Sequence, residues 1–137
     1  MYLSLLNEKQ KNLFLGFAYH LSNIDDDFSN SERQMLDSYC VEMNVEFSDE
    51  TEKNTIEELK NTAKAIFDEK SAKIVLFELI GLAMADKNYD GSERNLISEL
   101  AEQFSVSQYF LEKCESLLSE YFDFQTKLNE FVLGQAV

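Results

Sequence analysis

The sequence predicts an all-α protein that folds as a single compact bundle of about seven helices. Proline is absent from the 137 residues, and glycine occurs only four times. Because proline breaks helix interiors and a chain of this length ordinarily carries about seven, its absence favours nearly continuous helix. Apolar residues make up 45% of the chain, which is long enough to bury a core of its own.

Runs of apolar residues spaced three or four apart divide the chain into its helices. One run, from Ile74 to Met84, is apolar on more than one face, which indicates a central helix surrounded by the others. We expect the stretch 107–134 to form two helices or one bent helix. The remaining helices are expected at 7–24, 30–44, 52–68 and 91–104.

The two halves of the chain align without a gap at an offset of 61 residues, which indicates an internal duplication. The acidic stretch DDDFSNSE at 25–32 falls on DKNYDGSE at 86–93, and Val45 falls on Val106. Core positions and turn positions therefore recur together.

The duplication predicts two helix-turn-helix halves packed into one core. The halves are expected at about 7–68 and 71–134, and the linker between them, at 68–73, is short. A short linker disfavours two independent domains, so residues 1–137 are expected to form one domain.

The formal net charge of −14 limits the partners that the surface can attract. It repels phosphate groups, so nucleic acid and anionic membrane surfaces are disfavoured. Basic proteins and divalent cations suit it better. No apolar stretch is long enough to span a bilayer, and the opening MYLSLLNEKQKNLF lacks the pattern of a signal peptide, so we expect a cytoplasmic protein.

The sequence offers few groups for catalysis. His20 is the only histidine, which disfavours a Ser-His-Asp or multi-histidine site within one chain. Cys40 and Cys114 are too few for a disulfide framework and are expected to be buried, reduced thiols. No glycine-rich phosphate loop is present. We therefore expect a protein that is not an enzyme.

Part of each acidic turn follows from the rules of helix capping. Ser29 with Glu32, and Asp90 with Glu93, have the spacing of a capping box at a helix start. Asp25 and Asp86 differ, because each lies at a helix C-terminus, where the helix dipole disfavours a carboxylate. Either an Asx-type hydrogen bond to backbone N–H groups or a bound cation would offset that cost.

The cation hypothesis predicts a site made only of oxygen ligands, which favours Ca²⁺, Mg²⁺ or Mn²⁺ over Zn²⁺. An EF-hand is excluded, since Ile97 stands where its twelfth-position glutamate is required. The candidate metal ligands are Asp25, Asp27, Glu32, Asp86, Asn88, Asp90 and Glu93.

The repeated turn resembles the signature of the TerB-like family, helical domains of the tellurite-resistance type. ADKNYDGSE at 85–93 is similar to one copy of that signature and IDDDFSNSE at 24–32 to the other, although Asp26 and Lys87 replace its glycine. The resemblance implies an all-helical bundle with an acidic surface that binds divalent metal, and a role in stress-related or membrane-associated complexes.

The C-terminal stretch EYFDFQTKLNEFVLG carries more large apolar residues than one amphipathic helix needs. They either fill the core or form a surface for a homodimer or another protein. The second reading makes the protein an interaction or scaffold module in which the acidic turns are purely structural.

Overall fold

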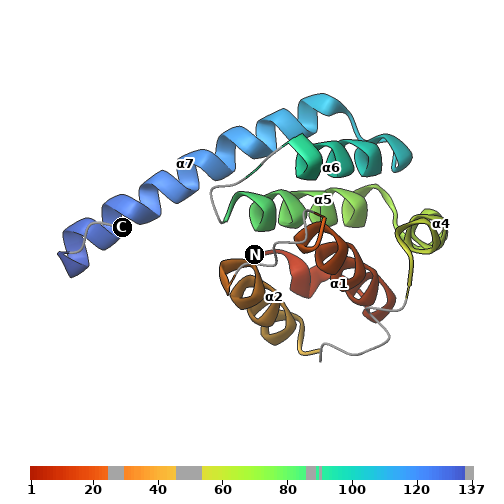
Figure 1. Ribbon diagram of the computed structural model, residues 1–137, viewed down its shortest axis with the longest axis horizontal. Coiled ribbons are helices and arrows are strands. Elements are labelled where there is room, and N and C mark those ends of the chain that lie inside the picture. The colour runs from red at the N-terminus through yellow and green to blue at the C-terminus, as the bar shows by residue number, and fades with distance from the viewer. Residues whose placement is uncertain (25–29, 46–53, 86–88, 90, 135–137) are drawn as a thin grey trace.

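The protein is all-α throughout the part that the computed structural model describes, namely residues 1–24, 30–45, 54–85, 89 and 91–134, with the backbone alone at 30–32. These residues form six α-helices, one 3-10 turn and no strand, packed as one compact bundle (Figure 1), which confirms the predicted class. The elements are η1 (Leu3–Leu5), α1 (Glu8–Ser22), α2 (Asn30–Met43), α4 (Ile56–Ile66), α5 (Glu69–Met84), α6 (Gly91–Gln103) and α7 (Gln108–Leu133).

The two alternatives for the C-terminal region resolve into one helix. α7 runs through 26 residues between its N-cap Ser107 and its C-cap Gly134, which adopts the left-handed conformation typical of a helix C-terminus. The sequence between them contains neither proline nor glycine, so nothing in it interrupts the helix. About seven helices were expected, and the described residues form six α-helices.

α5 is the central helix, as its apolar pattern predicts. It packs against α1, α6, α7, α2 and η1, and Figure 1 shows it between α1 and α6. Side chains on several of its faces are fully buried, among them Val75, Leu76, Leu79 and Ile80. A helix surrounded in this way has no polar face to present to water, which explains why its sequence lacks a simple amphipathic stripe.

The N-termini of α1 and α5 carry the same cap at the offset of 61 residues (7 to 68). The Asn7 side chain accepts from the Gln10 N–H, and the Gln10 side chain accepts from the Asn7 N–H, both at 2.9 Å. Asp68 and Ser71 make the same reciprocal pair, both bonds at 2.8 Å. Each box satisfies two N–H groups that the first helical turn leaves without an intrahelical acceptor.

The C-termini of α2 and α6 also match at this offset (44 to 105). Asn44 and Ser105 are the two non-glycine residues with positive φ in the described chain, at 56° and 58°. The next residue, Val45 or Val106, donates its N–H to the carbonyl five residues back, at 3.0 and 2.8 Å. Both ends therefore form a Schellman-type cap, built on residues that adopt the left-handed conformation at some cost.

The first six residues fold back onto the bundle, a feature that the sequence analysis did not foresee. Leu3, in η1, is completely buried. The Glu78 carboxylate of α5 accepts from the Met1 amino group and from the Tyr2 N–H, both at 2.9 Å. Glu42 of α2 accepts from the Leu3 N–H at 3.0 Å. Two carboxylates thus hold the segment across α2 and α5.

Candidate functional site

Most of the predicted metal ligands lie outside the described residues. This applies to Asp25, Asp27, Asp86, Asn88 and Asp90, and it applies to the side chain of Glu32. Glu93, the seventh, is described and is 2% exposed at the start of α6. Within the described part of the chain, no three His, Cys, Asp or Glu side chains gather as a metal site would need.

Beside Glu93, a charged cluster ties the start of α6 to α7. The Arg94 guanidinium donates to both Glu115 carboxylate oxygens, at 3.2 and 3.1 Å. The Tyr89 hydroxyl also hydrogen-bonds to Glu115, and burial together with the Glu115 charge raises the pKa of this phenol. A bidentate arginine pair fixes relative orientation as well as adding energy. Tyr89, in the second acidic turn, and Arg94 beside it therefore help to pack α6 against α7.

The remaining reactive side chains are held in ordinary structural contacts. The His20 ring lies with Nε2 at 2.7 Å from the Asn54 carbonyl oxygen. Both cysteines are free thiols, Cys114 buried as predicted and Cys40 half-buried. Burial and the neighbouring Glu115 charge raise the pKa of Cys114 to about 11, so this thiol stays protonated near neutral pH.

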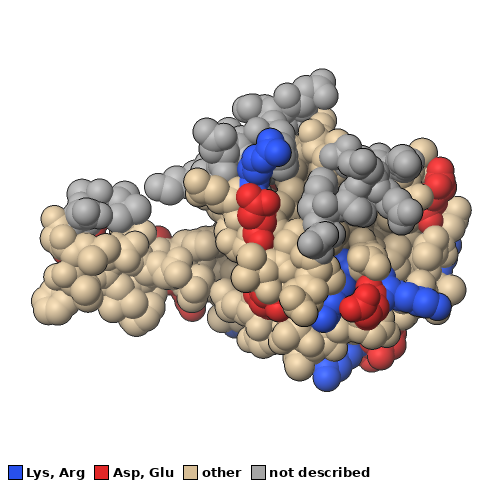
Figure 2. Space-filling model, turned by 90° about the horizontal axis from the view of Figure 1, so that it is seen from below, with Lys and Arg blue, Asp and Glu red and all other residues tan. Residues whose placement is uncertain are grey.

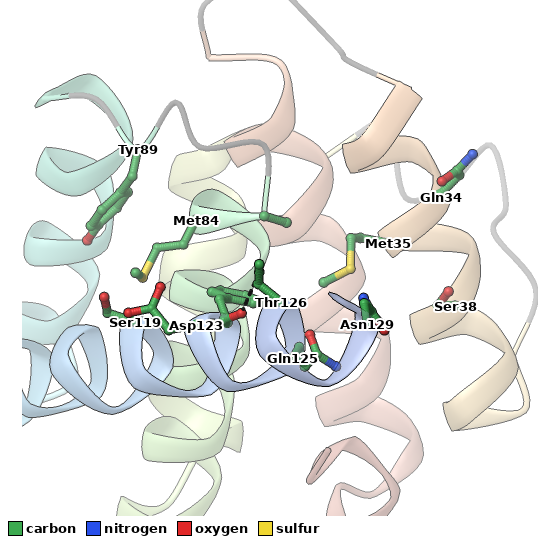
Figure 3. Close-up of a pocket in the computed structure, with 12 residues that line it drawn as sticks. Gln34, Met35, Ser38, Met84, Tyr89, Ser119, Asp123, Gln125, Thr126 and Asn129 are labelled. Carbon is green, nitrogen blue, oxygen red and sulfur yellow. Dashed lines mark hydrogen bonds between the residues drawn. The ribbon is translucent and has the colours of Figure 1, made fainter. Parts of the chain in front are cut away.

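A groove of about 860 Å³ lies where α7 passes α2 and the end of α5 (Figure 3). Its lining is apolar at Met35, Met84 and Phe122 and polar at Asp123 and Asn129. Figure 3 shows Asp123 on the side of α7 that faces Met84. Amide, hydroxyl and carboxylate groups beside methionines suit contacts with a polar chain segment better than the enclosure of an apolar ligand.

The outer half of α7 projects from the bundle as an arm, which is visible in Figure 1 and again in Figure 2. Only the inner part of the helix is anchored, through the buried side chains of Leu111, Cys114 and Leu118. In Figure 2 the arm is almost entirely without basic side chains, in contrast to the body.

Eight large apolar side chains of α7 are exposed, and five of them follow one another at alternating steps of four and three residues. This is the spacing with which one helix packs along another. The five are Leu117 at 48%, Tyr121 at 38%, Phe124 at 59%, Leu128 at 44% and Phe131 at 89% exposed. We call this set the α7 seam.

The α7 seam lies roughly opposite the groove on the helix, at about 100° per residue. Groove-lining residues such as Phe122 and Thr126 face the body, and seam residues such as Phe124 and Leu128 face away from it. The seam runs about 21 Å along the helix, at 1.5 Å per residue. The C-terminal aromatics could either fill the core or form a surface. For the five side chains of the seam, their exposure excludes a place in the core.

Comparison with protein-family models, with curated proteins and with solved structures finds no match to this chain. The TerB-like resemblance therefore stays a prediction from the repeated turn. As for membranes, the described helices include none with both the length and the apolar character to cross a bilayer.

The metal hypothesis also stays a prediction, and it has a direct test. If Asp25 and Asp86 bind a hard cation, millimolar Ca²⁺ or Mg²⁺ raises the melting temperature of the parent protein. Linkage gives about 2.7 kcal/mol when the ion is in hundredfold excess over its dissociation constant. Asp25→Asn and Asp86→Asn should lose the divalent-specific part of this response, measured against Na⁺ at equal ionic strength. Variants that respond like the parent would leave the turns as folding elements alone.

Proposed function

We propose that this protein is a non-enzymatic interaction module that docks a partner helix on the α7 seam. The observation that carries the proposal is a regular apolar stripe on a helix that extends beyond its own bundle. Phe131 is 89% exposed and Phe124 59%, although burying a phenylalanine side chain is worth about 1.5–3 kcal/mol. Contiguous exposed apolar surface of this kind marks interaction sites.

The spacing of the seam favours a helix as the docked element. Alternating steps of four and three keep the stripe on one side of a helix that winds around a partner, with each side chain entering a hole between partner residues. Scattered surface hydrophobics, such as Val41 on α2, show no such period.

We propose further that the bundle arose by duplication, in agreement with the TerB-like pattern. The matched caps of α1 with α5 and of α2 with α6, all at the same offset, support this origin. Beyond α6 the halves diverge, since the counterpart of α4 falls inside the long α7. That divergence creates the arm, so the part of the protein that departs from the repeat is the part assigned to binding. We propose a stress-related role for such a module on the strength of the TerB-like resemblance of its repeated turn alone.

Site-specific photocrosslinking tests the proposed docking face. We expect p-benzoylphenylalanine at Phe124 or Phe131 of the full chain to form discrete protein adducts in cells. The same residue at Val41, which is 81% exposed on α2, is the matched control and should form none. An adduct with a second copy or with another protein supports the module. Equal adduct patterns from α2 and α7, or none from either, would contradict it.

A further inference from the structure

We propose that the partner on the α7 seam is a second copy of this chain, with the two α7 helices antiparallel and a twofold axis beside Phe124. This inference rests on the proposed function, because it names the partner of the same seam. A twofold interface brings the same patch of each copy together, so the patch must be complementary to itself. The side chains of the seam and its flanking charges meet that requirement.

Side-chain size is complementary in the antiparallel arrangement. With Phe124 at the axis, Leu117 comes opposite Phe131 of the second copy, and Tyr121 comes opposite Leu128. Each layer away from the axis then combines one aliphatic with one aromatic side chain, which keeps the filled volume even along the interface. A parallel pair in register would place aromatic on aromatic in some layers and leucine on leucine in others.

The charges beside the seam select the same arrangement. Glu120 and Lys127 are both exposed, and each directly precedes a seam residue. Among the described residues neither takes part in an ion pair. Glu120 and Lys127 lie on either side of Phe124 at similar distances along the chain. A twofold axis beside Phe124 therefore brings Glu120 of each copy beside Lys127 of the other. Flanking charges of this kind set partner choice and orientation in helix pairs.

The distribution of net charge also favours antiparallel helices. Residues 117–133 contain three acids (Glu120, Asp123 and Glu130) and one lysine, a net charge of −2, so −12 of the total −14 lies elsewhere. An antiparallel pair places the two acidic bodies at opposite ends of the joined helices, whereas a parallel pair places them side by side. Like charge on adjacent bodies opposes association.

The length of the seam sets the strength of the pair. Two stripes of about 21 Å form an interface at the small end of the range for specific complexes. We therefore expect a monomer–dimer equilibrium across the micromolar range. Sedimentation equilibrium of the full chain at physiological salt measures it.

A charge swap tests the flanking pair. Glu120→Lys and Lys127→Glu should each weaken the dimer by about tenfold, since each creates two like-charge contacts in a twofold pair. The double variant restores both contacts and should return to the parent dissociation constant. Val41→Glu, on α2, is the control and should leave dimerisation unchanged. A double variant as weak as the single ones would overturn the assigned pairing.

Cysteine crosslinking tests the direction of the helices, in a Cys40→Ser background that leaves only the buried Cys114. Phe124→Cys should form a disulfide with itself, because the twofold axis brings the two copies together there. Leu117→Cys should crosslink only when mixed with Phe131→Cys. If each of these crosslinks to itself instead, the helices are parallel and the inference fails. A protein that stays monomeric throughout the micromolar range, yet forms seam adducts with another protein, overturns this inference and leaves the proposed function standing.

Discussion

Phe17→Ala is expected to lower the free energy of unfolding by about 3–5 kcal/mol, the largest effect of any single change considered. Phe17 of α1 is fully buried. Its ring lies 6.4 Å from that of Phe67 and 6.1 Å from that of Phe104, and these two rings are 5.4 Å apart. Phe67 follows α4 and Phe104 follows α6, so one ring joins three parts of the bundle. Its removal leaves a cavity that three separate elements would have to move to fill.

Urea denaturation followed by circular dichroism measures this change, and Phe131→Ala provides the comparison. Phe131 has the same side chain but is 89% exposed, so its truncation should change stability by less than about 0.5 kcal/mol in the monomer. Similar losses for the two variants would mean that Phe17 does not pack against Phe67 and Phe104 as described.

Glu78→Ala is expected to cost about 2–3 kcal/mol, because it removes the acceptor that holds the N-terminal segment to α5. The Glu78 side chain is 5% exposed and accepts from the Met1 amino group and the Tyr2 N–H. Without it, the Tyr2 N–H loses its acceptor, and the Met1 amino group keeps only the Glu42 carboxylate, at 3.2 Å. Leu3, which this contact keeps buried, would also gain freedom to leave the core.

The matched variant for this test is Glu78→Gln. Glutamine keeps an oxygen that accepts from the Tyr2 N–H but loses the charge that faces the Met1 amino group, so an intermediate loss of stability is expected. In the Glu78→Ala variant, the backbone amides of Leu5 and Leu6, which hydrogen-bond within the N-terminal segment, should exchange faster than in the parent. Unchanged exchange there in the Ala variant would show that the burial of Leu3 holds the segment unaided.

The helices could be predicted because their signals are local. Apolar residues such as Leu13, Phe14 and Phe17 repeat with the helical period, and the helix ends fall at residues with capping side chains. The central place of α5 was also foreseeable, since a helix that is apolar on several faces can only be surrounded. For α7 the absence of a breaker was the signal, and giving it full weight would have selected one helix over two.

The contacts that the sequence did not reveal join residues far apart in the chain. Glu78 reads as an isolated acid within an apolar helix, and only its partner 76 residues away explains its burial. The surface character of Phe124 and Phe131 was likewise undetermined, because the apolar pattern of a helix does not tell where its bundle ends. Among the candidate metal ligands, only Glu93 has a described side chain. Its neighbours Arg94 and Tyr89 both contact Glu115 of α7, a long-range contact that the spacing of the repeated turn could not reveal.

The bundle explains why the arm of α7 is helical. A helix of the arm's length is marginal in water by itself, because its first turn fixes several residues for a single hydrogen bond. Here that nucleation step is already complete, since Leu111, Cys114 and Leu118 hold the inner turns inside the bundle. Each residue from there to Gly134 needs only to propagate an existing helix, and propagation is close to neutral in free energy. The bundle thus acts as a template that keeps the outer part of α7 helical without further contacts.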